Sequence, residues 1–148
     1  MARYRTTVES SLSPAEAFAY LADFSNARHW DPSVETASQP HGGPVARGTE
    51  FDLVVRFGGR RIPLHYTIVS FDEPRSFVIE ARQPTFISRD TVTVAPLGDS
   101  SKQGSSVHYD AALNFRGGVG RMLDPVLQLL FNRTGAKAEA GLRAALNP

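Results

Sequence analysis

The feature that most constrains this fold is a change in the hydrophobic period near residue 118. Over residues 49–116, apolar and polar residues alternate in short runs that are separated by clusters of turn-forming residues. Alternation of this kind is typical of β-strands with one buried face. From Val119 onward, apolar residues recur at helical spacing, as in Met122, Val126 and Leu130, and continue to Ala145. This order predicts a sheet whose single apolar face is covered by one long C-terminal helix.

The alternating runs predict a first strand near the N-terminus and about six more after residue 33. Gly58 and Gly59 between two of the runs predict a tight hairpin, and residues 72–75 and 97–104 predict two further turns. Consecutive strands joined by short turns pair antiparallel, and a sheet with one apolar face is covered on one side only. The expected strands lie at residues 3–10, 34–38, 49–57, 62–68, 76–82, 86–95 and 105–116.

Two short helices are expected between the first strand and the second. Ser13 can cap a helix, Pro14 suits the first helical position, and Glu16 completes a capping box with Ser13. A second helical turn over residues 27–30 should end at Asp31, because a residue that precedes proline disfavours helical geometry. The chain is therefore predicted to be α+β, with a curved antiparallel sheet, two short helices after the first strand, and a long C-terminal helix.

Composition and charge exclude several functional classes. The 148 residues, 41% of them apolar, fit one globular domain over residues 1–148. The absence of cysteine excludes a disulfide scaffold and thiolate chemistry. The 16 basic and 15 acidic residues are scattered and give a net charge of +1, unlike the concentrated basic surface of a nucleic-acid-binding protein. We therefore expect no nucleic-acid partner.

The sequence also lacks the motifs of a metal, cofactor or nucleophile site. The histidines have no metal-ligand spacing, and His65 and His108 fall on polar strand faces, where we expect exposure to solvent. No G-x-S-x-G motif is present. No run approaches the ~18 apolar residues needed to span a bilayer, and no signal-peptide core follows Met1. We expect a cytoplasmic protein with no metal, no cofactor and no membrane span.

Several short segments occur in a characteristic order and spacing along the chain. They are residues 13–23, 29–34, 48–51, the strand containing Tyr66 together with residues 72–75, and residues 123–126. In these segments the chain resembles the START/Bet v 1-like superfamily, and specifically its polyketide cyclase/dehydrase and lipid-transport branch, and the resemblance covers nearly the whole chain. It implies a helix-grip fold, in which an incomplete barrel-like sheet grips the last helix around an internal cavity.

A strongly curved sheet and one straight helix cannot interdigitate along their whole length, so part of the space between them should remain open as a pocket. Such pockets are mostly apolar and carry a few placed polar groups. We expect the lining to come from the apolar strand faces, the last helix and the single tryptophan. The predicted pocket residues are Trp30, Phe51, Leu53, Val55, Leu64, Tyr66, Phe77, Ile79, Phe86, Ser88, Tyr109, Leu113, Met122, Val126 and Leu130.

No catalytic residue is established by the sequence, but Tyr66, Tyr109 and Asp90 are candidates. The tyrosine hydroxyls could orient a ligand or act as acids, or each ring could simply pack in the core with one polar partner. Asp90 and Ser88 share a strand face with apolar residues. A carboxylate on such a face is costly unless it is paired or protonated. Asp90 is therefore either a general base with a raised pKa, or a residue left at the rim by a bulge after Ser88 or by a strand start.

Two further features concern the walls and the opening of the pocket. Trp30 either stacks on a ligand or plugs the end of the core. The glycines at positions 117, 118 and 120 fit a flexible hinge better than a phosphate-binding loop, because the remaining P-loop residues are missing. Pro125 should kink the last helix or mark a restart, so the front of this helix could gate the pocket.

Two functions agree with these features. One is binding or carriage of a small hydrophobic molecule, such as a lipid or polyketide, by a monomer or homodimer. The alternative is a polyketide aromatase/cyclase or dehydratase that acts on a bound poly-β-keto chain. The purity of the apolar strand faces favours binding, whereas several convergent titratable groups in the pocket would favour catalysis.

Overall fold

A computed structural model describes residues 1–99, 103–117 and 119–148, and all of their side chains except those of residues 119–124. Seven strands and a long helix are joined by two short helices and one 3-10 turn, in the predicted order. The elements are β1 (Ala2–Ser10), α1 (Pro14–Ala22), η1 (Phe24–Asn26), α2 (Ala27–Trp30), β2 (Val34–Ser38), β3 (Glu50–Phe57), β4 (Arg60–Asp72), β5 (Ser76–Arg82), β6 (Phe86–Pro96), β7 (Ser105–Phe115) and α3 (Val119–Ala145).

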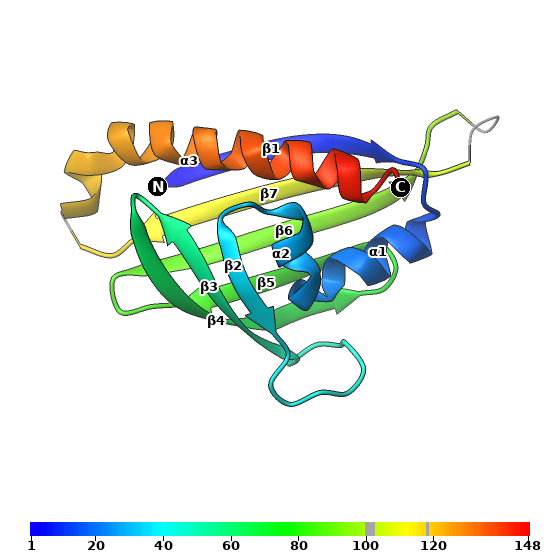
Figure 1. Ribbon diagram of the computed structural model, residues 1–148, viewed down its shortest axis with the longest axis horizontal. Helices are drawn as coiled ribbons and strands as arrows, with labels where there is room; N and C mark the ends of the chain where they lie inside the picture. Colours follow the sequence, from blue (N-terminus) through cyan, green and yellow to red (C-terminus); the bar gives the residue numbers. More distant parts are fainter. Residues whose placement is uncertain (100–102, 118) are drawn as a thin grey trace.

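The strands form one antiparallel sheet in the order β1-β7-β6-β5-β4-β3-β2 (Figure 1). Strands β2 to β7 follow one another along the chain, while β1 pairs with β7 and so joins the N-terminus to the last strand. The turn between β3 and β4 is the predicted hairpin, because Gly58 and Gly59 have φ angles of +61° and +77°, in the region that favours glycine.

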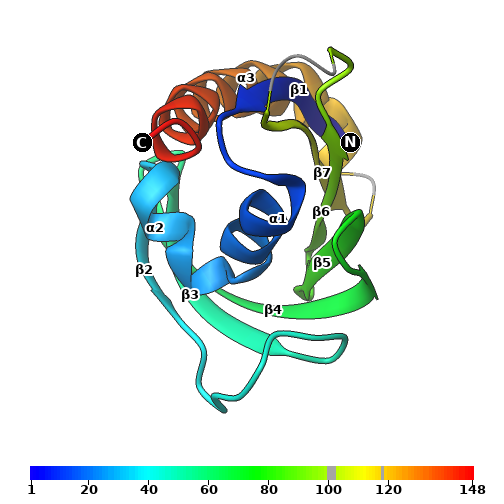
Figure 2. The ribbon, with the colours of Figure 1, turned by 90° about the vertical axis from the view of Figure 1, so that its right-hand side faces the viewer.

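The sheet curls around α1 and is closed on the remaining side by α3 (Figure 2). Helix α1 starts at the predicted capping box, in which the Ser13 hydroxyl accepts from the Glu16 amide at 3.2 Å. Helix α3 lies along β1 and against α2. Gly141 allows this close packing, since a Cβ atom at that position would lie 1.8 Å from the carbonyl oxygen of Trp30. The helix-grip architecture that the resemblance implies is therefore present.

One end of the curled sheet is filled by aromatic side chains from the short helices. The ring of Phe18 in α1 makes edge contacts with Phe71 and Phe77, at centroid distances of 5.3 and 5.6 Å. Phe24 in η1 packs on Phe51 at 6.3 Å and on Tyr66 at 5.2 Å. This end of the molecule is thus a packed core, while open space remains between the inner face of the sheet and α3.

Helix α3 runs without interruption from Val119 to Ala145 and contains Pro125, so the predicted restart at this proline is wrong. Pro125 is the seventh residue of α3, so the helix continues past it without the one backbone hydrogen bond that a residue other than proline would donate there. The predicted glycine hinge lies partly outside the described residues, because Gly118 is not among them. None of the described helices is long and apolar enough to cross a membrane.

The outer face of the sheet is polar and carries the histidines that were predicted to be exposed. The Nδ1 atom of His65 lies 2.7 Å from Asp52 Oδ1, and this hydrogen bond raises the pKa of His65. His108 is exposed beside Thr7. The Glu80 carboxylate is sandwiched between Arg82 and Arg89. The charges of His65 and Glu80 and of their partners therefore lie on the outer face of the sheet.

Candidate ligand-binding cavity

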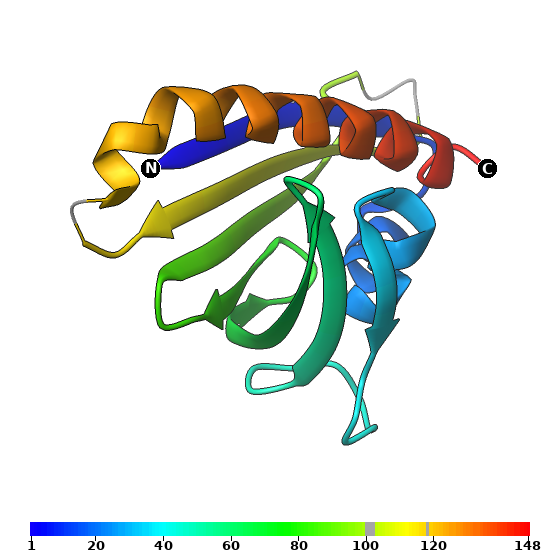
Figure 3. The same cartoon turned by 60° about the vertical axis from the view of Figure 1, so that its left-hand side comes forward.

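A cavity of about 380 Å³ lies between the inner face of the sheet and α3. Its walls are mainly apolar, with leucine and phenylalanine side chains from β3, β4, β6, β7 and α3. Figure 3 shows the β3–β4 hairpin rising toward α3. Phe57 next to the hairpin tip contacts Phe131 of α3 at a centroid distance of 6.2 Å, and together they border one end of the cavity. Volume and lining are typical of a small-molecule site.

The first polar group in the wall is a pair of hydroxyls from Tyr66 and Ser88, whose oxygens lie 3.0 Å apart. Tyr66 on β4 is paired with Ala81 on β5, and Ala81 is paired with Ser88 on β6. Because the side chain between them is only a methyl group, the tyrosine can reach across β5 to the serine. Tyr66 is 5% exposed, so its hydroxyl is held at the cavity wall rather than in solvent.

The second polar group is a hydrogen bond in which the Tyr109 hydroxyl donates to Asp90 Oδ2 at 2.6 Å. Tyr109 on β7 lies opposite Val92, and Asp90 is the next residue on the same face of β6. The direct partner of Asp90 on β7 is Ala111, whose small side chain leaves the carboxylate open to the cavity. The distance is in the range of a charge-assisted hydrogen bond.

The surroundings of Asp90 raise its pKa from an ordinary value of 3.8 to about 7. Burial among apolar groups is the main cause, because it disfavours the charged carboxylate. The hydrogen bond from Tyr109 opposes this effect, and the negative charges of Asp31 and Asp110 add to it. Asp90 can therefore exchange a proton near neutral pH, which is the property required of a general acid or base.

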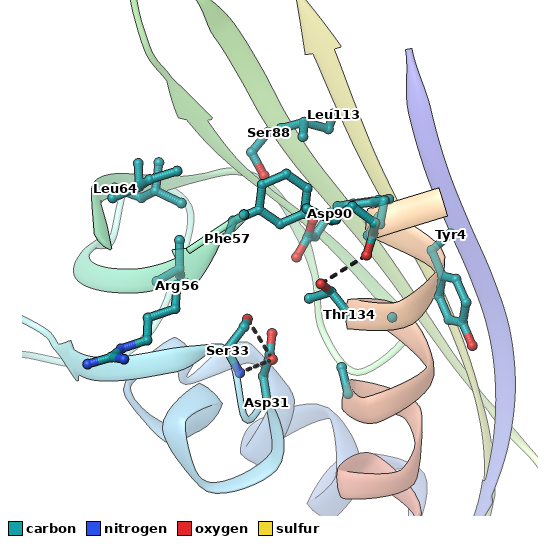
Figure 4. Close-up of a pocket in the computed structure, with 18 of the residues that line it drawn as sticks. Tyr4, Asp31, Ser33, Arg56, Phe57, Leu64, Ser88, Asp90, Leu113 and Thr134 are labelled. Carbon is teal, nitrogen blue, oxygen red and sulfur yellow. Dashed lines mark hydrogen bonds between the residues drawn. The ribbon is translucent and has the colours of Figure 1, made fainter. Parts of the chain in front are cut away.

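Asp31 brings a second carboxylate to the cavity from the end of α2. Its Oδ1 accepts from the Ser33 amide at 2.9 Å and from the Ser33 hydroxyl at 2.8 Å (Figure 4). Burial raises the pKa of Asp31, and the two hydrogen bonds from Ser33 oppose this rise. Its position is determined by the close approach of α2 and α3 at Gly141, because Asp31 directly follows Trp30.

Basic side chains border the cavity only near the β3–β4 hairpin, as far as the described residues show. The Arg56 guanidinium donates to Glu35 Oε1 at 2.7 and 2.9 Å and points away from the cavity in Figure 4. Arg60 lies at the start of β4, is exposed, and makes no ion pair with any described residue. No basic side chain that the structure describes therefore neutralises the polar cluster of Asp31, Asp90, Tyr66 and Tyr109.

Between α3 and β1 the cavity is bordered by a third carboxylate, that of Glu139. It accepts hydrogen bonds from the Tyr4 hydroxyl at 3.2 Å and from the Thr6 hydroxyl, and Arg143 lies 3.4 Å away. These bonds lower the pKa of Glu139, with the Thr6 hydroxyl the largest cause. Glu139 is thus paired with a cation, whereas the described donors to Asp31 and Asp90 are all uncharged.

Many of the residues predicted to line a pocket border this cavity, and the tyrosines do so with hydrogen-bond partners inside it. Trp30 packs against Tyr109 at a centroid distance of 5.5 Å and is 4% exposed, so it forms part of the wall. The predicted residues on the cavity wall are Trp30, Val55, Leu64, Tyr66, Phe86, Ser88, Tyr109, Leu113 and Leu130.

Other predicted pocket residues lie elsewhere. Phe51, Leu53, Phe77 and Ile79 are at most 3% exposed and belong to the core beside α1 and η1, where the rings of the short helices occupy the space. Alternation identified their face correctly, but it could not show which end of the sheet the short helices fill.

The last helix also differs from its predicted orientation. Val126 is 63% exposed, whereas the following residue, Leu127, borders the cavity together with Leu130 and Phe131. Consecutive helical residues point about 100° apart. The apolar stripe of α3 is centred on Leu127 and not on Val126, and Val126 therefore points toward solvent. The side chain of Met122 lies outside the described part of the chain.

The expectation that a bulge after Ser88 or a strand start leaves Asp90 at the rim is wrong. The pairing of β6 is regular on both sides, with Asp90 opposite Ile79 on β5 and Ala111 on β7. Asp90 is therefore near the middle of β6, and Tyr109 and the possibility of protonation compensate for its burial.

Several cavity residues were not predicted. Asp31 was assigned only to the end of a helix, and no periodicity could reveal that α3 would pack beside it. Thr134 of α3 also borders the cavity, and its hydroxyl donates to the Leu130 carbonyl at 3.1 Å (Figure 4). No cluster of three or more metal-ligating side chains occurs among the described residues.

Known proteins resemble this chain in family and in fold. A family model described as polyketide cyclase/dehydrase and lipid transport matches residues 1–147. No curated protein sequence matches. Among solved structures, a START superfamily protein from Mycobacterium smegmatis is similar with a TM-score of 0.73 and 16% identity, covering 99% of this chain and 97% of that one.

Two other solved structures have the same fold. A protein from Thermus thermophilus gives a TM-score of 0.75 at 15% identity, over 98% of this chain and 95% of its own. Major latex-like protein 151 from Panax ginseng gives 0.70 at 13% identity, over 99% and 98%. At these identities the likeness concerns the fold.

Proposed function

The chain belongs to the polyketide cyclase/dehydrase and lipid transport family of the START/Bet v 1 superfamily, and from this premise we propose that it binds a small hydrophobic molecule in the cavity under α3. The observation that carries the proposal is the cavity itself, which combines about 380 Å³ of mainly apolar space with one polar cluster. Apolar walls provide most of the binding free energy, and the cluster orients the ligand.

The proposal is tested by titration with N-phenyl-1-naphthylamine, an uncharged probe that fluoresces in apolar surroundings. We expect saturable binding of one probe per chain. Thr134→Phe should reduce the affinity at least tenfold, because the added ring fills the cavity that Thr134 borders. Arg133→Phe is the matched control, since Arg133 is the adjacent exposed residue on α3. Equal affinities for both variants would show that the probe binds outside the cavity.

A second function, a polyketide cyclase or dehydratase activity, is favoured by one observation. Asp90 has a pKa of about 7 in an apolar cavity, and the Tyr66 hydroxyl lies in the same wall. The Asp90 carboxylate would remove a proton from a carbon between two carbonyls, and Tyr66 would donate a hydrogen bond to the resulting enolate oxygen.

This activity is tested with a small β-diketone in D₂O. Exchange of its central protons, followed by NMR, should be faster with the wild-type protein than with Asp90→Asn. Equal exchange rates for the two proteins would leave binding as the only function of the cavity.

A further inference from the structure

We infer that the cavity selects hydrophobic molecules whose buried end donates hydrogen bonds, as an alcohol or a protonated amine does, and rejects molecules that carry a carboxylate at that end. The inference rests on the proposed function, since it specifies which ligands the same cavity accepts. The site is the apolar cavity, and the carboxylates of Asp31 and Asp90 select the chemical group at the buried end of the ligand.

The first argument is the position of the two carboxylates. Asp90 comes from the middle of β6 and Asp31 from the junction of α2 and β2, and both border the same cavity (Figure 4). They are close enough for the charge of Asp31 to affect the proton affinity of Asp90. A donor placed at this end of the cavity would therefore interact with two acceptors.

The second argument is that none of the described side chains places a cation at this end. The donors that reach the carboxylates are the Tyr109 hydroxyl and the Ser33 amide and hydroxyl, all of them uncharged. Arg56 is bound to Glu35, and Arg60 lies at the hairpin, so no described basic side chain pairs with Asp31 or Asp90. A ligand carboxylate here would meet two like charges in a poorly solvated space, whereas an ammonium group would be attracted.

The third argument is the distribution of apolar surface. Phe57, Phe131, Leu130 and Leu127 border the cavity on the side of the β3–β4 hairpin and α3, and none of them offers a polar group to a ligand. A ligand with one polar end is therefore oriented with its apolar body against these side chains. Its donor then lies against the polar cluster.

The titratable and charged groups around Asp90 predict how the selection changes with pH. Because Asp90 gains its charge as the pH rises through about 7, the preference for an amine over an alcohol should increase from pH 5.5 to pH 8.5. Other titratable or charged groups also face Asp90 or border the cavity from the neighbouring elements. They are Tyr66, Tyr109, Asp31, the outer-face Asp110, Glu139 with Tyr4, and Arg56 and Arg60 near the hairpin.

The test uses three compounds with one ring system: naphthalen-2-ylmethanol, naphthalen-2-ylmethylamine and 2-naphthoate. Each is titrated against the complex of the protein with N-phenyl-1-naphthylamine at pH 8.5. We expect the amine and the alcohol to displace the probe at concentrations at least tenfold lower than the naphthoate does. Naphthoate displacement as effective as that of the alcohol would overturn the inference, while failure of the probe itself to bind would overturn the proposed function instead.

Variants assign the selection to the two carboxylates. Asp90→Asn and Asp31→Asn, which keep the side-chain size, should each reduce the preference for the amine over the naphthoate at least threefold. Asp72→Asn is the control, because Asp72 is an exposed residue at the end of β4 that pairs with Arg75 and does not border the cavity. An equal reduction in the control would show that the overall charge, and not the cavity, selects the ligand. The emission of Trp30 verifies that each variant is folded.

Discussion

Replacing Asp90 with asparagine should change the pH dependence of stability in a defined direction. Because the folded chain raises the pKa of Asp90 from 3.8 to about 7, it binds this proton more tightly than the unfolded chain does. The contribution of Asp90 to stability is therefore fully present below pH 4 and decreases as the pH rises toward 7. This pKa difference corresponds to about 4 kcal/mol. Asparagine cannot titrate and retains an oxygen that accepts from Tyr109.

The assay is urea unfolding of the wild type and of Asp90→Asn at pH 5 and pH 8. Relative to the wild type, the variant should gain about 3 kcal/mol of unfolding free energy between these two values, since part of the effect is already present at pH 5. Comparing the two proteins removes the contributions of other groups with shifted pKa values, such as Glu35 and His65. Asp110→Asn provides the control for the loss of one negative charge.

A stability difference that does not depend on pH would refute this reasoning. It would mean that Asp90 has an ordinary carboxyl pKa and that solvent in the cavity compensates for its burial. The role of Asp90 as a general base would then lose its support. Binding of an uncharged ligand in the cavity would remain open to its own test.

Three further predictions concern packing and polarity. Gly141→Ala should lower the unfolding free energy by about 3 kcal/mol, measured by urea denaturation, because the new methyl group meets the Trp30 carbonyl; an unchanged value would contradict this contact. Leu142→Ala should cost about 3 kcal/mol in the same assay, whereas Val126→Ala should cost less than about 0.5 kcal/mol; similar costs would show that α3 is oriented differently. The double variant Tyr66→Phe and Tyr109→Phe should bind naphthalen-2-ylmethanol about tenfold more weakly in probe displacement; unchanged affinity would remove both hydroxyls from the site.

The sequence predicts the elements of the fold well because its local signals agree with each other. The strand at residues 76–82, the capping box at Ser13 and the glycine hairpin at residue 58 are all confirmed. Alternation also identifies the inner face of the sheet, including Tyr66 and Tyr109. These features depend on neighbours in the sequence, and such signals can be read without a structure.

The site is less predictable because its parts meet only in three dimensions. Whether Phe77 borders a cavity or the core depends on where Phe18 packs, and sequence periodicity does not contain this information. The position of Asp31 depends in the same way on Gly141, which lies 110 residues later in the chain. The helical period predicts the apolar stripe of α3, but it locates the centre of the stripe only to within one residue. A shift of one residue is enough to change Val126 from buried to exposed.

Binding of a hydrophobic molecule in the cavity under α3 is the central proposal, and locating a bound ligand by NMR would test it directly. With naphthalen-2-ylmethanol bound, intermolecular NOEs should connect its ring protons to the methyl groups of Leu113 and Leu130, which border the cavity. The methyl groups of Val126 and Leu129, exposed on the outer side of α3, should show none. NOEs to Val126 and Leu129 without any to Leu113 would place the ligand on the outer surface and contradict binding in the cavity.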